Sequence, residues 1–309
     1  MRKAERRHWL DALSPQELRE LLALHDLRSW TSLAVNWGLV FGSFALVGAV
    51  PHPLTVLVAL FVIGGRQLGC AVLMHEASHR TLLRRRALND WVGDWLCAYP
   101  VWAAMKPYRR YHLRHHAHTW TEQDPDLDLA RPFPVTRASL ARKVWRDLSG
   151  RTGWKRVRAI LRRDFGRSQG KTSRRNEVGW RTLVPVVVTN AAILAPLWAF
   201  GWPELYLLWP VAWMTTYSLA MRIRAIAEHS MPGDPADELL NARTTEASLW
   251  ERALLAPNRV NFHLEHHLIM AVPHYHLPRL RRLLLERGVL EHVPRTPGYV
   301  ALLSRASSA

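Results

Sequence analysis

The chain has 309 residues, of which 49% are hydrophobic and 22% are charged, and its 42 Lys and Arg against 25 Asp and Glu give a formal net charge of +17. This length allows one large domain or two modest ones. Its two cysteines, Cys70 and Cys97, exclude a disulfide framework and a built-in iron–sulfur centre, which needs four thiolates or a close substitute.

The positive charge is distributed unevenly along the chain. Apolar residues are concentrated in four long runs, and the Lys and Arg lie almost wholly outside them, as is typical of membrane proteins. Residues 131–181 contain 16 Lys or Arg and three acidic residues, which amounts to +13. A positive-inside bias beside a membrane explains this stretch, and docking of an acidic redox partner is the alternative. A nucleic-acid partner is not expected, because the stretch has no base-reading motif.

Residues 1–29 are predicted to form a cytoplasmic amphipathic N-terminal helix on the membrane surface. Ser14 and Glu17 have the spacing of a capping box, with Pro15 at the first helical position. The leucines that follow share one helix face. A signal peptide is the alternative, but its apolar core would lie nearer the start of the chain.

Residues 30–74 predict the first transmembrane hairpin. Two almost uncharged runs flank a turn at residues 51–53, and each is long enough to cross a hydrocarbon core of about 30 Å, which takes about 20 helical residues. The turn carries no Lys or Arg and is therefore placed outside the cytoplasm. Arg66 interrupts the second run. Two roles are open for this arginine: pairing with a structural partner, or lining a substrate tunnel.

Residues 75–181 predict a cytoplasmic region. Residues 87–104 are apolar but broken by polar, proline and tryptophan residues, which favours an interfacial or re-entrant segment over a span. The basic stretch predicts a helix over residues 140–163, followed by a glycine-containing loop over 166–173.

Residues 182–222 predict the second transmembrane hairpin, with apolar runs at 183–200 and 205–221 and a turn without Lys or Arg. Residues 223–309 predict a cytoplasmic C-terminal region. Both outer turns lack positive charge, so both termini are placed in the cytoplasm. The predicted fold is an all-α, multi-pass integral membrane protein whose four transmembrane helices are capped by a cytoplasmic helical domain.

Three histidine boxes stand in the predicted cytoplasmic regions, with spacings that place their imidazoles on one helix face. The boxes are His75 and His79; His112, His115 and His116; and His263, His266 and His267. Two copies of the i, i+3, i+4 pattern are not expected by chance in a chain with 16 His. The boxes therefore predict a common metal centre.

Other polar residues near the boxes are candidates for the same centre. His229 follows the fourth apolar run at a depth that matches His75, so it is a candidate ninth ligand; a favourable contact with the helix C-terminus is the alternative. Asp124, Asp126 and Asp128 follow the second box, where turn chemistry favours a supporting role over ligation.

Eight box histidines and His229 exceed the four to six ligands of one first-row transition metal, so two metals are implied. Neutral imidazole suits Fe, Zn, Cu and Ni, so the ligands alone leave the metal open. A structural zinc needs four ligands and no lipid access, whereas this centre would lie at the mouth of a helix bundle, where an acyl chain can enter. His274 and His276 lie beyond Pro273 and off the helical register, and are predicted to be surface groups or to support the ligands.

The three boxes in this order, with Glu228 and His229 between the second and third, resemble the membrane fatty acid desaturase family, from about Trp30 to Leu280. The three residues between His75 and His79 look like the acyl-lipid branch, because the acyl-coenzyme A branch has four. The run from Arg222 into Glu228-His229, and Asn261-Phe262 before the third box, look like bacterial members. The resemblance therefore implies a bacterial cytoplasmic membrane.

The resemblance implies a non-haem centre of two iron ions that uses O2 and two electrons to remove hydrogen from an unactivated methylene. The ligands that it implies are His75, His79, His112, His115, His116, His229, His263, His266 and His267. Glu76, Glu228 and Glu265 are expected to orient imidazole N–H groups. Acyl-coenzyme A members hold a water through an Asn one turn before the extra His, where this chain has Ala225; Asn258 and Asn261 are the candidates to replace it.

The activity implied by the resemblance is insertion of a cis double bond into an acyl chain of a membrane lipid. The chain has no His-Pro-Gly-Gly haem signature, so a separate electron donor of ferredoxin or cytochrome type is expected on the basic cytoplasmic face. A hydroxylase or ketolase of a carotenoid, sphingolipid or alkane is the alternative, because the same ligands serve oxygen insertion. A metal transporter is not expected, because the spans contain Arg66 and no His.

Overall fold

The computed structural model describes residues 8–165 and 179–308. Up to residue 165, the α-helices are α1 His8–Asp11, α2 Pro15–Leu21, α3 Asp26–Ala49, α4 Pro53–His79, α5 Arg86–Val92, α6 Met105–His118, α7 Leu127–Ala130, α8 Arg137–Leu148 and α9 Arg151–Phe165. From residue 179, they are α10 Gly179–Ala199, α11 Leu208–Met214, α12 Thr216–His229, α13 Leu249–Leu254, α14 His263–Leu268, α15 Leu277–Glu286 and α16 Tyr299–Ala306. Shorter elements are the π-helix η2 Gly93–Ala98 and the 3-10 helices η3 Tyr99–Val101, η4 Pro203–Leu207, η5 Pro257–Arg259 and η6 His274–His276. Within these ranges the only β-structure is three isolated bridges, so the all-α prediction is confirmed.

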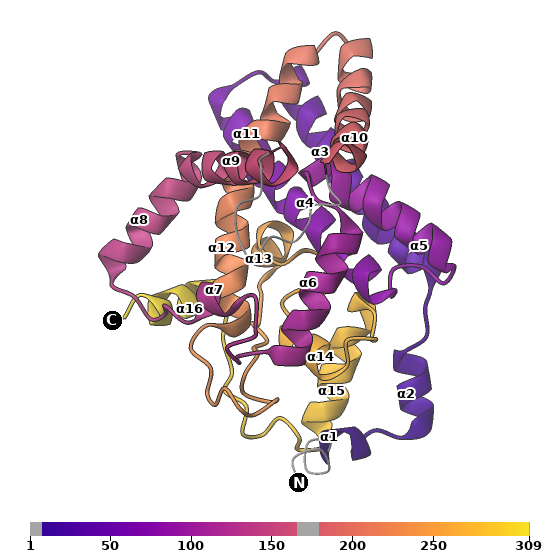
Figure 1. Cartoon of the computed structure of the whole chain (residues 1–309), viewed down its shortest axis with the longest axis vertical. Helices are drawn as coiled ribbons and strands as arrows, with labels where there is room; N and C mark the ends of the chain where they lie inside the picture. Colours follow the sequence, from indigo (N-terminus) through magenta and orange to yellow (C-terminus); the bar gives the residue numbers. More distant parts are fainter. Residues whose placement is uncertain (1–7, 166–178, 309) are drawn as a thin grey trace.

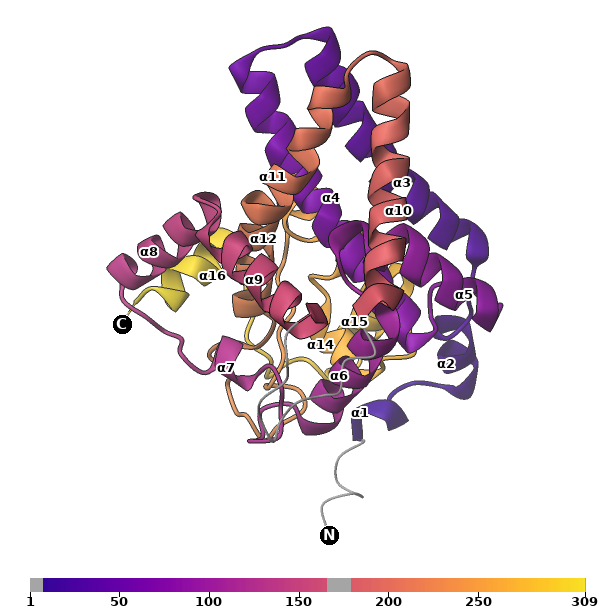
Figure 2. The same ribbon diagram turned by 45° about the horizontal axis from the view of Figure 1, so that its top comes forward.

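Helix α4 is the centre of the molecule. It forms an antiparallel hairpin with α3 and also contacts α6, α11, α12 and α13 (Figures 1 and 2). Glycines allow this close packing, because a Cβ at Gly64 would lie 2.2 Å from Thr216 Oγ1, and one at Gly65 would lie 2.8 Å from the Leu254 carbonyl oxygen. Two elements that precede the third histidine box, α12 and α13, are thereby held against the helix that carries the first box.

Three helical stretches in the described ranges are long and apolar enough to cross a membrane: residues 15–49, which include α3, then Pro53–His79, and Arg181–Ala199. These correspond to the first three predicted spans. The helices α3, α4, α10 and α11 extend to one end of the molecule, and α1, α14 and α15 lie at the other (Figure 1).

The fourth apolar run differs from the prediction of one continuous span. Helix α11 ends at Met214 and α12 begins at Thr216, because Thr215 has φ −112 and ψ −86. Hydroxyl groups compete here for backbone carbonyls: Thr215 Oγ1 donates to the Val211 oxygen at 2.7 Å, and Ser218 Oγ donates to the Met214 oxygen at 3.0 Å. Side-chain hydrogen bonds of this kind bend helices, and here they accompany a break that hydropathy alone does not predict.

Two local predictions are confirmed in part. Ser14 and Glu17 form the expected capping box at the start of α2. The basic stretch is helical, but as α8 and α9 instead of one helix, because Gly150 adopts a left-handed φ of +76 between them. The predicted loop at residues 166–173 lies outside the described residues.

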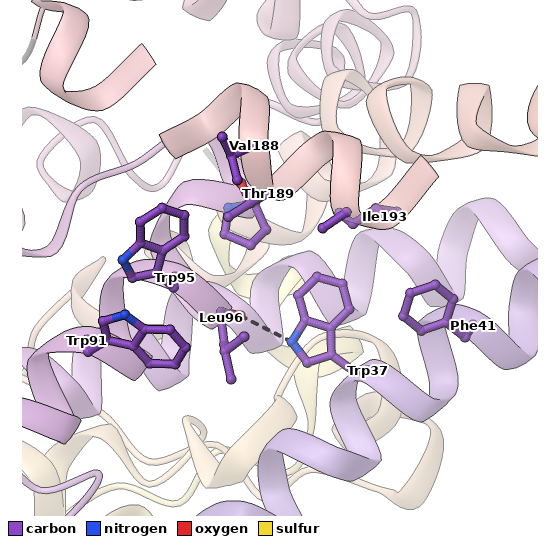
Figure 3. A pocket seen from close by; sticks show the side chains of 10 residues that line it. Trp37, Phe41, Trp91, Trp95, Leu96, Val188, Thr189 and Ile193 are labelled. Atoms are coloured by element: carbon purple, nitrogen blue, oxygen red, sulfur yellow. Dashed lines mark hydrogen bonds between the residues drawn. The ribbon is translucent and has the colours of Figure 1, made fainter. Parts of the chain in front are cut away.

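An apolar groove lies beside the segment predicted to be interfacial. This segment consists of α5, η2 and η3, and together with α3 and α10 it encloses about 360 Å³ (Figure 3). The groove is lined by Trp37, Phe41, Trp91, Trp95, Leu96, Pro100, Val188, Thr189, Ala192 and Ile193. The Trp37 indole N–H donates to the Leu96 carbonyl oxygen at 3.2 Å, which fixes α3 against η2.

Candidate metal centre

The first histidine box forms the end of α4. His75 and His79 stand one turn apart, with ring centroids 4.8 Å from each other. The helix ends directly after them, because Arg80 adopts a left-handed φ of 63 and its N–H returns to the Glu76 and Ala77 carbonyl oxygens. The box is therefore carried on the rigid end of the longest helix.

The second box lies on α6, and Arg109 fastens this helix to the end of α4. Its Nε donates to the Ser78 oxygen at 2.8 Å, and its Nη2 donates to the Ala77 oxygen at 2.9 Å. The same group pairs with Asp90 at 2.7 Å. Arginine bonds to terminal carbonyls compensate the helix dipole and set the distance between two boxes. Arg109 is not among the predicted site residues, because it stands three residues before His112 and differs in no local pattern from its neighbouring arginines.

The third box lies on the short helix α14. The segment before it is held by a bridge between Thr244 and Phe262, and by Asn261, whose Nδ2 donates to the Thr245 oxygen at 2.9 Å. His229, at the end of α12, faces this box: its Nε2 lies 2.8 Å from His263 Nε2. Chain segments far apart in sequence therefore converge on one region.

All nine histidines predicted as ligands are brought together, in two clusters within which the candidate ligand atoms lie within 4.8 Å of one another. The five-histidine cluster consists of His75, His79, His112, His116 and His266; the four-histidine cluster consists of His115, His229, His263 and His267. The second and third boxes contribute to both clusters, whereas the first box contributes only to the five-histidine cluster. His229 completes the four-histidine cluster.

The donor set fits metal ions. The Nε2 atoms of His112 and His116 are 2.9 Å apart, and those of His115 and His229 are 3.0 Å apart. Two nitrogens at about 2.1 Å from one ion, at a right angle, lie about 3.0 Å apart. Some ring nitrogens are buried without a hydrogen-bond partner among the described residues, namely Nε2 of His75, His79 and His267. Such atoms are costly unless something binds them.

The protonation state of the cluster also suits a metal. Burial and neighbouring imidazoles hold the pKa of His112, His116, His263, His266 and His267 well below the usual value. Burial, together with His115, lowers the pKa of His229 to about 3. Metal ligation requires neutral imidazole, so these histidines are prepared to bind an ion near neutral pH.

Carboxylates contact the outer nitrogens of three histidines. Asp124 Oδ1 lies 2.8 Å from His115 Nδ1, which supports the predicted auxiliary role for this aspartate. Asp126 is 3.8 Å from the same nitrogen, and Asp128 is exposed. Glu228 Oε1 lies 3.4 Å from Nδ1 of the first histidine of box three. An acceptor at Nδ1 leaves the Nε2 lone pair free for a metal.

Glu76 and Glu265 behave differently from each other. Glu76 Oε1 lies 3.5 Å from His75 Nδ1. Glu265, expected to orient an imidazole, instead binds the hydroxyl of Thr244 and pairs with Arg281 at 2.8 Å. Its place on α14 faces away from the clusters and toward α15, which the box sequence alone does not reveal.

The candidates Asn258, Asn261 and Arg66 have different surroundings. Asn258 lines a small cavity together with His75, His263 and His266, whereas the amide of Asn261 is bonded to Thr245. Arg66 donates to the Ala253 carbonyl oxygen on α13, which is the structural pairing that sequence analysis left open.

His274 and His276 are both buried, so their prediction as surface groups is wrong. They are the first and last residues of the 3-10 helix η6, which packs against the start of α3, and their burial depends on contacts from distant segments. His274 lies beside Glu76, which agrees with the alternative that it supports the ligands.

Comparison with known proteins gives the family. The sequence model of the family described as fatty acid desaturase matches residues 51–298. The chain is 26% identical over 247 residues to dihydrorhizobitoxine desaturase of Bradyrhizobium elkanii, which covers 76% of this chain and 68% of the relative. It is 22% identical to an sn-1 oleoyl-lipid 12-desaturase of Picosynechococcus, over 84% of this chain and 77% of the relative. It is also 26% identical to a beta-carotene ketolase of Paracoccus, over 81% of this chain and 92% of the relative. The protein therefore belongs to the fatty acid desaturase family.

Proposed function

We propose that this protein is an O2-dependent, non-haem di-iron desaturase that inserts a double bond into an acyl chain of a membrane lipid. The observation that carries the proposal is the convergence of nine histidines in one group of five and one group of four. A structural zinc needs only four ligands, so two such groups side by side favour a centre that does chemistry.

The five-histidine cluster would hold one iron, and the four-histidine cluster would hold the other. When bound, the irons supply O2 activation: one O2, two electrons and two protons remove two hydrogens from the acyl chain and yield two waters. The protein holds the imidazoles neutral and orients them through Asp124, Glu228 and Glu76. Asp124 and Glu228 contact histidines of the four-histidine cluster, and Glu76 contacts one of the five-histidine cluster.

For the membrane topology, we propose four spans with both termini in the cytoplasm. The two hairpins, within residues 30–74 and 182–222, would cross the membrane, with the broken α11 and α12 pair as the fourth span. Residues 1–29, 75–181 and 223–309 would be cytoplasmic. Exposed apolar side chains on α3 and α10, such as Leu39 and Val187, support contact with lipid.

An acyl chain is the substrate that best fits the surroundings of the centre. The groove in Figure 3 lies between two helices that are apolar enough to span a membrane, and its lining is apolar. It offers an acyl chain a place to leave the bilayer between α3, α10 and the α5–η3 segment. The lipid named for the Picosynechococcus relative supports the same substrate class.

We propose that the electron donor is a separate protein of ferredoxin or cytochrome type. A second groove, of about 690 Å³, is lined by His116 of one cluster and His267 of the other, with polar residues including Thr121, Glu238 and Asn241. Its lining mixes polar and apolar side chains, so it gives the centre an approach that differs from the apolar groove. A soluble donor can come within reach of both clusters there.

Oxygen insertion is the second candidate function. Its support is the similarity to beta-carotene ketolase, whose sequence is covered over 92% of its length. Product analysis separates the two activities, because a desaturated product has lost two hydrogens and a hydroxylated product has gained one oxygen.

The deciding experiment is metal analysis of the detergent-purified protein together with fatty-acid methyl esters from a host that expresses it. Two irons per chain and a new unsaturated ester are expected. Two irons with unchanged esters would direct the search to carotenoid, sphingolipid or alkane products. Zinc without iron, after growth in iron-replete medium, would contradict the di-iron proposal.

A further inference from the structure

His274 connects the first span to the first histidine box. Its backbone N–H donates to Glu76 Oε2 at 2.9 Å, and its ring Nδ1 lies 3.4 Å from the same oxygen. On the other side, its Nε2 lies 3.0 Å from Ser32 Oγ in α3. The second carboxylate oxygen of Glu76 lies 3.5 Å from His75 Nδ1. A continuous series of contacts therefore runs from α3 through His274 and Glu76 to a histidine of the five-histidine cluster.

The hydrogen-bond directions agree with this series. A neutral His274 that donates from Nδ1 to Glu76 accepts at Nε2, so the Ser32 hydroxyl faces two acceptors: the His274 Nε2 at 3.0 Å and the Arg28 carbonyl oxygen at 3.1 Å. At Glu76, the hydroxyl of Thr81 donates to Oε2 at 3.1 Å, beside the His274 contacts. All the donors thus bind one carboxylate oxygen, and the other oxygen is turned toward His75.

Glu76 differs from the other two glutamates that flank the histidines. Glu228 pairs with Arg224, and Glu265 pairs with Arg281. Glu76 is 2% exposed, and among the described residues its ion-pair partners are histidines, without Lys or Arg. A buried carboxylate needs donors from its surroundings. His274, which is 3% exposed, takes the place that an arginine has at the other two sites.

The backbone around His274 is fixed from several directions. Pro273 precedes η6, and the hydroxyl of Tyr275 accepts the His25 N–H at 2.8 Å. The Arg28 guanidinium lies over the Tyr275 ring, 5.4 Å from its centroid. The segment after the third box is thus docked on the start of the first span, which places His274 against Glu76.

We propose that His274 is a positioning residue for the metal centre: it holds Glu76 so that this carboxylate faces His75 Nδ1 and His75 Nε2 is directed into the five-histidine cluster. The inference rests on the proposed di-iron function. Neither ring nitrogen of the buried His75 has a hydrogen-bond partner among the described residues: Nε2 is free for an ion, and Nδ1 has the 3.5 Å ion-pair contact with Glu76 Oε1. Loss of the His274 ring would therefore weaken metal binding at the five-histidine cluster more than at the four-histidine cluster.

The test compares four forms of the full-length protein purified with iron: wild type, His274→Leu, His274→Asn and His276→Leu. Asparagine keeps a donor near the position of Nδ1. His276 is the matched control, because it lies on the same η6 helix and is 7% exposed, but contacts His25 and, within residues 8–165 and 179–308, no carboxylate. Each form is measured for iron per chain, for the rate of iron release to a chelator, and for the thermal unfolding midpoint after iron removal.

The His274→Leu protein is expected to release one of its two irons about 10–100-fold faster than wild type, while the other iron is released at the wild-type rate. His274→Asn should restore most of the retention, and His276→Leu should match wild type. Equal release rates in His274→Leu and wild type, or equal weakening of both irons, would overturn the inference. If His274→Leu does not fold, the comparison of His274→Asn with wild type decides: iron release more than 100-fold faster would overturn it. Failure of wild type itself to bind iron would instead count against the proposed function.

Discussion

His116 and His267 stack on each other, with ring centroids 4.3 Å apart and planes inclined by 27°, although they belong to different clusters. Both line the groove of about 690 Å³. This pair is therefore a contact between the two candidate metal sites at the position where solvent approaches them.

Replacement of either member of this pair should remove activity without unfolding the protein. His116→Ala and His267→Ala are each expected to lower product formation more than about 100-fold, because each removes one ligand from one cluster. The proteins should still be extracted from membranes as folded monodisperse species. His292→Ala, at an exposed position, is the control. Full activity in either cluster variant would remove that residue from the ligand set.

Arg109 should stabilise the centre by joining α6 to the end of α4. Its guanidinium bonds to the Ser78 and Ala77 oxygens and to Asp90. Arg109→Leu would remove the side-chain donor of the Ser78 oxygen and the ion-pair partner of Asp90, so we expect a loss of about 1–3 kcal/mol in the free energy of unfolding and a lower iron content. Arg114→Leu changes an exposed arginine of the same helix and should have little effect. Similar unfolding midpoints for both variants would show that the Arg109 contacts are not important.

Two glycines of the spans are expected to respond to alanine substitution with opposite changes in stability. A Cβ at Gly65 would meet the Leu254 backbone, whereas a Cβ at Gly42 in α3 has no described atom within 4 Å. Gly65→Ala is therefore expected to destabilise the protein by about 1–3 kcal/mol, because α4 and α13 must separate. Gly42→Ala should be neutral or stabilising by up to about 1 kcal/mol, because alanine favours helix. Thermal unfolding in detergent measures both, and equal midpoints would contradict the close approach of the two helices.

The sequence allowed prediction of features that depend on local spacing. The three histidine boxes, the capping box at Ser14 and the first hairpin follow from periodicity and turn residues, and all are present in the structure. Features that depend on distant partners were not predictable. The break at Thr215 arises from hydroxyl groups that bind carbonyls, and a hydropathy pattern does not contain this competition.

The same limit applies to the residues around the histidines. His274 is buried because η6 docks on α3, a contact between segments more than 240 positions apart. Glu265 resembles Glu76 in its position beside box histidines, yet it is paired with Arg281 on α15. A motif identifies candidate ligands, but the direction of each neighbouring carboxylate is set by packing.

Metal removal should destabilise the protein, and this effect should be separable from catalysis. The clusters contain buried ring nitrogens without partners among the described residues, so an ion that binds only the folded state raises its stability by mass action. A chelator is therefore expected to lower the thermal unfolding midpoint, and either Fe²⁺ or Zn²⁺ should restore it, since both bind imidazole. Only Fe²⁺ should restore product formation, because zinc has no redox chemistry. An unchanged midpoint after complete metal removal would show that the histidine clusters do not hold structural or catalytic ions, and activity with zinc would contradict the proposed oxidation.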